Sequence, residues 1–258
     1  MVKFSSGRRT LWVGLLLLVL LCICAGVYVV PPLRAQLAAN EECCQIPFPR
    51  SVVVASAELM GRTYPSQIGQ DKWVLETMFP GVTDGYFLDV GSGHGTFHSN
   101  TAELERRGWT GICVDPFPTS METRTCQMFK EVVWSVPGKV MTFQKAEGLG
   151  GLADTLDRWK DEAMKAPSVE ITTTTLDDLL ARAKAPAFIH FLSLDIEGAE
   201  LEALRAFPFD KIRVGAMAIE HNYEEPKRTE LIEFLAQRGY RRTHEFNQDD
   251  FFAPTKAD

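Results

Sequence analysis

Residues 86–95 read Tyr-Phe-Leu-Asp-Val-Gly-Ser-Gly-His-Gly, a short apolar run that leads directly into a glycine-rich turn. Two longer apolar runs follow at 187–194 and 212–219, and segments with helical hydrophobic spacing lie between the runs. Nearly continuous apolar runs are typical of parallel strands that are covered on both faces. The alternation of strands and helices therefore predicts an α/β fold with a doubly wound, mostly parallel, Rossmann-like sheet.

The remaining elements of this domain follow from similar patterns. Thr175 with Asp178 resembles a capping box and starts a helix that runs through residue 183. Pro226 and Gly239 delimit another helix, because proline suits a first turn and glycine commonly follows a helix end. We also expect a helix at 96–107 and short strands at 109–114, 132–134 and 140–143.

The glycine-rich turn predicts a ligand site. Glycines at 91, 93 and 95 let a ligand approach the backbone, and the N–H groups of the turn and of the next helix favour an anionic group. A dinucleotide pattern would need glycine at position 96, where Thr96 stands, so the spacing disfavours a nicotinamide dehydrogenase. The spacing and the preceding Asp89 favour S-adenosylmethionine, whose carboxylate would take the N–H groups and whose cationic groups suit acids.

A second acid, Asp115, ends the next predicted strand, where a carboxylate can accept the hydroxyls of an adenosine ribose. We therefore expect the cofactor site to consist of Asp89, Gly91, Ser92, Gly93, Gly95 and Asp115.

Candidate catalytic residues follow the two long apolar runs, so they are expected at the same edge of the sheet. Asp195 is the first candidate, as a base or as the group that orients the acceptor; the alternative is that it caps a helix starting near Glu197. His221 is the second candidate base, and the alternative is a loop histidine. Glu197 and Glu200 are expected to face solvent or the helix N-terminus. Asp195 with Glu220 would suit Mg²⁺, but we assign no metal from the sequence.

The first 30 residues differ in charge from the rest of the chain. Lys3, Arg8 and Arg9 are the only charged side chains before residue 34, whereas all 34 acidic residues come later, against the remaining 24 of the 27 bases. We do not expect so acidic a domain to bind nucleic acid, which requires a basic face. Residues 11–30 carry no charge and would span roughly 30 Å of hydrocarbon as a helix.

This run predicts a transmembrane anchor in the lipid bilayer, of the signal-anchor type. A cleaved signal peptide is disfavoured, because the run exceeds the usual apolar region and ends in Pro31-Pro32 without a small-residue cleavage site. The flanking bases keep residues 1–10 in the cytosol by the positive-inside rule. We therefore expect a single-pass membrane protein, in the ER or Golgi membrane if the cell is eukaryotic, with a stem at 31–60 and one domain at 61–258.

Four cysteines follow the anchor. In an oxidising lumen we expect Cys126 to pair with Cys43 or Cys44, which would tie the stem to the domain; four free thiols, including Cys113, are the alternative.

Several blocks of the domain resemble the FkbM-type methyltransferases. They occur in the family's order between about residues 64 and 253: Ser66-Gln-Ile-Gly-Gln-Asp71, Gly85-Tyr-Phe-Leu-Asp-Val-Gly91, Ser99-Asn-Thr101, Gly108-Trp-Thr-Gly-Ile-Cys-Val-Asp-Pro116, Ser193-Leu-Asp-Ile-Glu-Gly-Ala-Glu200 and Glu220-His-Asn222. The resemblance implies a class I methyltransferase fold, S-adenosylmethionine as donor, and O-methylation of a glycan or small-molecule acceptor. It also implies that Gln67, Gln70 and Asp71 close over the cofactor.

The resemblance leaves a second function open, because some membrane-anchored relatives act as trafficking or scaffold proteins without catalysis. One departure bears on this alternative: His94 stands where the family usually carries Asp or Asn. It is either part of an altered cofactor loop or an exposed histidine at a helix start. The retained glycines and Asp115 favour the enzyme.

Overall fold

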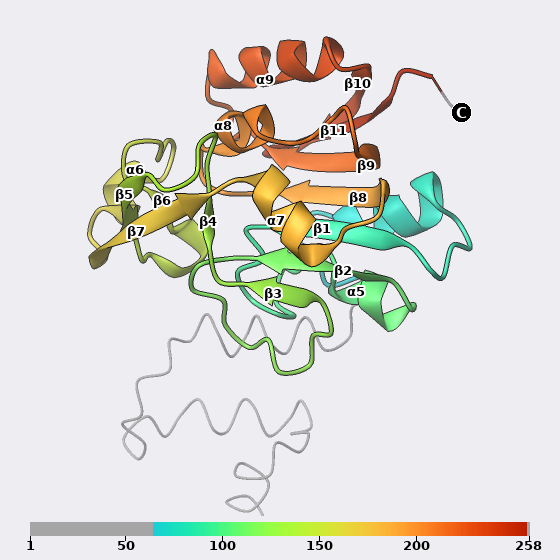
Figure 1. Ribbon diagram of the computed structural model, residues 1–258, viewed down its shortest axis with the longest axis horizontal. Coiled ribbons are helices and arrows are strands. Elements are labelled where there is room, and N and C mark those ends of the chain that lie inside the picture. Colours follow the sequence, from blue (N-terminus) through green and yellow to red (C-terminus); the bar gives the residue numbers. More distant parts are fainter. Residues whose placement is uncertain (1–63, 257–258) are drawn as a thin grey trace, which may run out of the picture. The chain divides into compact units, whose positions relative to one another are not determined.

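Seven strands form the large sheet of the computed structural model, which describes residues 64–256 (Figure 1). Their order across the sheet is β10-β11-β9-β8-β1-β2-β3. The five strands from β9 to β3 are parallel, and β11 and β10 continue the sheet in antiparallel pairing. The bounds are β1 Tyr86–Val90, β2 Thr110–Val114, β3 Gln127–Phe129, β8 Phe188–Leu194, β9 Arg213–Glu220, β10 Tyr240–Phe246 and β11 Asp249–Pro254.

Helices cover both faces of this sheet. Side chains alternate along each strand, so Leu88 and Val90 of β1 face one apolar core and Phe87 faces the other. The first core is closed by α7 (Leu176–Ala183), α8 (Glu200–Arg205) and α9 (Lys227–Ala236). The second is closed by α4 (Gln70–Trp73), the π-helical turn η1 (Val74–Met78) and α5 (Ala102–Arg106). The mixed α/β prediction is confirmed.

A second, four-stranded sheet was not expected from the sequence. Its order is β4-β7-β5-β6, and its strands are β4 Val132–Val133, β5 Val140–Gln144, β6 Gly151–Leu152 and β7 Ser168–Thr174. The short helices η2 (Glu147–Leu149) and α6 (Lys160–Ala163) belong to the same region. In Figure 1 the sheet lies beyond the carboxyl ends of β8 and β9, and Val132, Met141, Phe143 and Leu152 form a small core with Ala199.

Two predicted helix boundaries are confirmed. The Thr175 hydroxyl caps α7 by accepting a hydrogen bond from the Asp178 N–H at 3.2 Å. Pro226 stands immediately before α9, and Gly239 takes a positive φ of 83° after it.

The helix expected at 96–107 is wrong in its first half, because α5 begins only at Ala102. Ser99 explains part of the difference. Its hydroxyl accepts hydrogen bonds from the N–H groups of Thr101 (3.4 Å) and Ala102 (3.1 Å), which gives this segment a side-chain alternative to helical bonding.

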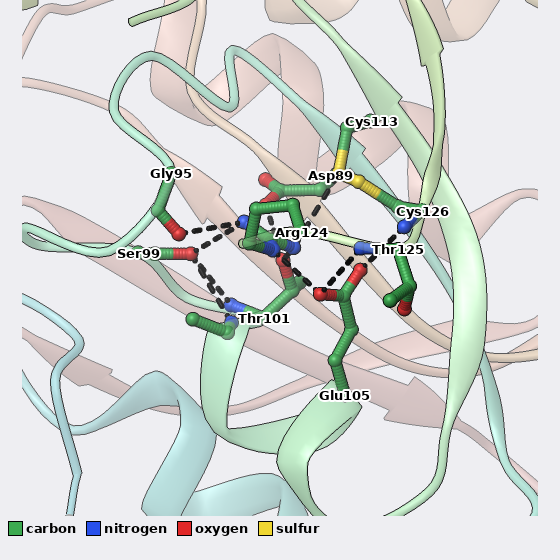
Figure 2. Close-up of a disulfide and its surroundings, with 10 residues drawn as sticks. Asp89, Gly95, Ser99, Thr101, Glu105, Cys113, Arg124, Thr125 and Cys126 are labelled. Atoms are coloured by element: carbon green, nitrogen blue, oxygen red, sulfur yellow. Dashed lines mark hydrogen bonds and ion pairs between the residues drawn. A yellow bond between two sulfur atoms is a disulfide. The ribbon is translucent and has the colours of Figure 1, made fainter. Parts of the chain in front are cut away.

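The expected pairing of Cys126 with Cys43 or Cys44 is also wrong. Cys126 forms a disulfide with Cys113 of β2, and their Cα atoms lie 5.8 Å apart (Figure 2). The bond joins β2 to the segment that leads into β3, so it fastens two neighbouring strands of the large sheet.

An ion pair beside the disulfide ties this corner to the glycine-rich turn (Figure 2). Arg124 pairs with Glu105 of α5 at 2.8 Å, and the two side chains are only 2% and 7% exposed. The same guanidinium donates to the Gly95 carbonyl and to the Ser99 hydroxyl, each at 3.1 Å. The disulfide loop, α5 and the turn are therefore held as one unit.

The predicted cytosolic segment, anchor and stem, at 1–10, 11–30 and 31–60, lie outside the described residues. Within residues 64–256, no helix has both the length and the apolar character needed to cross a membrane.

Peptide mapping of non-reduced protein, with free thiols blocked at lysis, is expected to identify Cys113 linked to Cys126. Cys126→Ala should lower the free energy of unfolding by about 3 kcal/mol, because the bond restricts the unfolded chain and joins residues 13 apart in the sequence. The matched control, Cys43→Ala with Cys44→Ala, should leave the stability of the domain unchanged. Recovery of Cys126 joined to Cys43 or Cys44 would contradict the fold described here.

Candidate active site

A cavity of about 620 Å³, including the space at its open mouth, lies between the carboxyl ends of the central strands and the small sheet. Its walls include Val90 and Gly91 after β1, Val114 and Asp115 after β2, and residues of β4, β5 and β6. Among the described residues, its lining contains no Lys or Arg but five acids: Asp115, Glu131, Glu147, Asp195 and Glu197. Such a cavity suits a cationic ligand.

The glycines of the turn serve different purposes. Gly91 has a φ of 86°, and a Cβ added there would lie 1.6 Å from the carbonyl oxygen of Asp195, so no side chain fits. Gly93 also lines the cavity, has a φ of 47°, and would place a Cβ no closer than 3.9 Å to its nearest neighbour, the Gly91 carbonyl oxygen. Gly95 packs against the Ser120 carbonyl and is not part of the cavity wall. Only the first two of these glycines are therefore placed to contact a ligand.

The N–H groups of the turn do not behave as expected for an anion site. Those of Gly91, Ser92, Gly93 and Gly95 all donate to oxygens of the protein itself, at 2.8–3.2 Å. The hydroxyl of Ser92 is buried without a hydrogen-bond partner, and Ser92 does not line the cavity. Because α5 starts only at Ala102, its N-terminus does not follow the turn directly. The predicted contact of a cofactor carboxylate with these N–H groups is therefore not supported.

Asp115 stands where the sequence predicts it, at the end of β2 and in the cavity wall. Its Oδ2 accepts from the Gly93 N–H at 2.9 Å and its Oδ1 from the Phe117 N–H at 2.7 Å. Burial raises the pKa of Asp115, and these two bonds oppose the rise. Since each carboxylate oxygen has a second lone pair, Asp115 can still accept the hydroxyls of a ribose.

Asp89 lies in β1, but it does not line the cavity. Its carboxylate is buried and accepts from the Thr101 hydroxyl at 2.5 Å. Burial raises the pKa of Asp89, and the nearby Arg124 opposes this effect. The structure thus gives Asp89 a contact with the segment before α5, while its predicted contact with a cofactor stays a prediction.

His221 is likewise outside the cavity wall. Its Nδ1 accepts from the Tyr223 N–H at 2.9 Å, and its Nε2 lies 3.9 Å from an Asp250 oxygen. The side chain is only 1% exposed, and burial lowers its pKa. The structure therefore does not bring His221 together with Asp195 in the cavity.

Asp195 lines the cavity directly after β8, and two glutamates join it. Each of Asp195, Glu197 and Glu220 has a carboxylate oxygen that lies within 4.8 Å of an oxygen of the other two. Asp195 does not cap α8, whose N-cap is Ala199. The sequence therefore places Asp195 correctly at the sheet edge, but gives no sign of the full cluster around it.

Glu197 and Glu200 do not face solvent, since both are buried, but Glu200 stands in the first turn of α8, as the alternative of a helix N-terminus predicted. Glu200 Oε1 accepts from the N–H groups of Ile196 (3.0 Å) and Gly198 (3.1 Å), which closes a tight turn after β8. Glu197 takes a φ of 54° in this turn, and its carboxylate meets those of Asp195 and Glu220 as a result.

These carboxyls have raised pKa values. Burial raises the pKa of Asp195 to about 6 and that of Glu197 to about 9. Burial also raises the pKa of Glu220 well above its ordinary value, and repulsion from Asp195 and Glu197 adds to the rise. The cluster therefore favours either protons or a bound cation.

Of the three polar residues that the resemblance placed over the cofactor, Gln67 and Gln70 lie beside β11, whereas Asp71 accepts a hydrogen bond from the Ser66 hydroxyl. Gln70 donates to Asp249 at 2.9 Å, and Gln67 accepts from Gln248 at 2.8 Å. Asp71 is buried. None of the three lines the cavity, so their closure over a ligand stays a prediction.

His94 caps the turn. Its Nδ1 lies 3.1 Å and 3.0 Å from the N–H groups of Thr96 and Phe97. Because these groups only donate, Nδ1 must carry a lone pair and the imidazole is neutral. Burial lowers the pKa of His94, which agrees with this state. An Asp or Asn side chain would accept the same bonds, so His94 preserves the geometry of the turn.

Three acids of the cavity wall were not predicted from the sequence: Glu131, Glu147 and Glu197. Glu131 and Glu147 lie next to β4 and in η2, at the edge of the small sheet; the sequence predicted two of its strands, near 132 and 140, but not that they form a separate sheet. Glu197 stands within residues 193–200, one of the segments that resemble the FkbM-type methyltransferases. This position was the only sign in the sequence that Glu197 could belong to the site.

Comparison with known proteins gives one match. The model of a family described as the methyltransferase FkbM domain matches residues 89–242, a span that runs from β1 into β10 and contains the whole cavity wall. No curated protein and no solved structure matches the chain.

Acidification is expected to loosen the turn through His94. Since the pKa of His94 is lowered in the fold, its stabilising contribution is present above the ordinary histidine pKa and is lost as pH falls through the folded value. We expect the fall in thermal unfolding midpoint between pH 7.5 and pH 5.5 to be smaller in His94→Asn than in the native chain. The difference should correspond to about 1 kcal/mol, the value of one or two lost hydrogen bonds.

The other histidines are common to both proteins, so their effects cancel in this comparison. Equal pH dependence of the two proteins would show that His94 does not cap the turn as a neutral imidazole.

Proposed function

Because the chain belongs to the FkbM methyltransferase family, we propose that it is an S-adenosylmethionine-dependent O-methyltransferase whose acceptor is a hydroxyl on a glycan or small molecule. The observation that carries the proposal is the acidic cavity at the carboxyl ends of the parallel strands, with Gly93 and Asp115 in its wall. In open α/β sheets, ligands bind at this edge. The strand order, with an antiparallel pair beyond β9, supports a class I methyltransferase fold.

The residues present suit this cofactor better than a dinucleotide. Asp115 would accept the ribose hydroxyls with the lone pairs that its two backbone bonds leave free, and no side chain at Gly93 separates a ligand from the backbone. Those acids of the wall that are ionised would stabilise a sulfonium and an ammonium group, whereas a pyrophosphate would meet repulsion.

Asp195 is the residue we propose to act on the acceptor. When bound, S-adenosylmethionine supplies a methyl group that a hydroxyl oxygen can take, with the S–C bond breaking and its electron pair remaining on sulfur. Asp195 would orient that hydroxyl and accept its proton as the O–C bond forms. With a pKa of about 6, Asp195 is mostly ionised at neutral pH, and a positioned base typically contributes about 10²–10⁴-fold to the rate.

His221 remains a secondary candidate base. The burial of its side chain outside the cavity wall favours Asp195 over it.

A second candidate function is that of a non-catalytic, membrane-anchored trafficking or interaction protein on the same fold. One observation favours it: the N–H groups of the turn at 91–95 that would hold the cofactor carboxylate already bond to the protein. Binding of S-adenosylmethionine separates the two functions.

We also propose that residues 11–30 anchor the chain in a membrane, with residues 1–10 in the cytosol and the domain in an oxidising lumen. The disulfide between Cys113 and Cys126 supports this placement, since such bonds persist in oxidising compartments. Recovery of both cysteines as free thiols from cells lysed with a blocking reagent would overturn the lumenal placement.

The full-length chain in detergent is expected to bind S-adenosylmethionine in a calorimetric titration. Asp115→Asn should weaken binding about tenfold, because the amide offers a single acceptor oxygen where the carboxylate offers two. Asp210→Asn, which removes an exposed acid before the amino end of β9 and outside the cavity wall, serves as the control and should bind as the native chain does. Absence of binding at millimolar cofactor would remove the enzyme proposal and leave the non-catalytic one.

Transfer of a labelled methyl group onto a panel of glycans, lipids and small alcohols is expected to yield an O-methylated product. Asp195→Asn should lower turnover on that acceptor about 100-fold or more, while the affinity for S-adenosylmethionine changes little. Full turnover by Asp195→Asn would show that Asp195 is neither the base nor the group that orients the acceptor.

A further inference from the structure

Three carboxylates converge at the carboxyl ends of β8 and β9. Asp195 directly follows β8, Glu197 stands in the turn after it, and Glu220 is the last residue of β9. One oxygen from each lies within 4.8 Å of the other two. Because β8 and β9 are parallel neighbours, their ends bring these residues together although they are distant in sequence.

The approach of Asp195 to Glu220 favours a bridging species. One carboxylate oxygen of each lies within 4.8 Å of the other. Ionised carboxylates only accept hydrogen bonds, so two of them this close are stabilised by a shared proton or by a cation between them. A single shared proton would still leave Glu197 as a further acid beside the pair.

A second observation independently indicates a missing partner at this place. Glu220 is 93% buried, and its Oε2 has no hydrogen-bond partner. Buried polar atoms are normally satisfied, so an orphaned carboxylate oxygen beside two other acids points to an ion. Within residues 64–256, no Lys or Arg forms an ion pair with any of the three; the nearby Lys227 pairs with Asp157 instead.

We propose that Asp195, Glu197 and Glu220 hold a divalent cation of the Mg²⁺ type. Carboxylate oxygens are the ligands that hard cations prefer. Opposite ligands of Mg²⁺ lie about 4.2 Å apart, twice the metal–oxygen distance, so oxygens within 4.8 Å need to move only slightly to coordinate it. The sequence alone indicated two of these ligands, and Glu197 is the third.

The cation would open onto the active-site cavity, because Asp195 and Glu197 line that cavity while Glu220 lies behind them. Mg²⁺ usually keeps several waters, and those on the cavity side are replaceable by an acceptor oxygen. Given the proposed methyl transfer, on which this step rests, coordination would lower the pKa of the acceptor hydroxyl. Asp195 would still accept the proton as the oxygen forms its bond to the methyl carbon, and the cation would make that proton easier to remove.

Metal binding is measured without cofactor or acceptor. A chain that binds no metal could therefore still prove to be a methyltransferase, and the two proposals can fail separately. Mn²⁺ is titrated into the full-length chain in detergent, and free Mn²⁺ is followed by electron paramagnetic resonance. We expect one Mn²⁺ per chain, displaced by Mg²⁺. Glu220→Gln should weaken binding about tenfold or more, and Glu197→Gln is the second ligand variant should Glu220→Gln not fold.

Asp249→Asn is the matched control, because Asp249 is a buried acid that pairs with Glu220 across β9 and β11 but lies outside the three-carboxylate cluster. It changes a neighbouring buried carboxyl without removing a ligand, so its Mn²⁺ affinity should change by less than about threefold. Absence of bound Mn²⁺ at millimolar concentration would overturn the proposal. Equal losses in the Glu220 and Asp249 variants would also overturn it, because they would indicate attraction by the general field rather than ligation.

Discussion

The close approach of the β1 turn to the end of β8 is the contact on which the site depends. The Asp195 N–H donates to the Val90 carbonyl at 3.0 Å, and the Asp195 carbonyl oxygen occupies the space that a Cβ of Gly91 would need. Glycine at position 91 is therefore required by the packing of the backbone. The same approach puts the carboxylate of Asp195 in one cavity wall with Gly93 and Asp115, where a methyl donor and its acceptor would have to meet.

Burial of like charges is the electrostatic cost of this arrangement. Asp195, Glu197 and Glu220 are held together by strand ends and by a turn that Glu200 closes, so they cannot separate to relieve their repulsion. Protons, a divalent cation and a cationic cofactor all offset that repulsion. A cavity with this charge thus favours cationic ligands. The same acids would therefore attract both the proposed divalent cation and the proposed methyl donor.

Much of the fold follows from local sequence signals, and the site follows less completely. The strands of the large sheet that carry continuous apolar runs, and the Thr175 cap of α7, were predictable because their signals are local. The disulfide of Cys113 with Cys126 was not, since cysteine spacing alone does not reveal which strands are neighbours. Glu197 was missed because its inward direction depends on a positive φ that Glu200 stabilises through the backbone.

The most direct measurement is a crystal structure of the chain grown with MnCl₂ and S-adenosylhomocysteine, with anomalous data collected at the manganese edge. We expect one anomalous peak between the carboxylates of Asp195, Glu197 and Glu220, with the ribose of the ligand on Asp115 and its sulfur facing Asp195. A ligand bound elsewhere, or a cavity filled by side chains with the three carboxyls sharing protons, would contradict it.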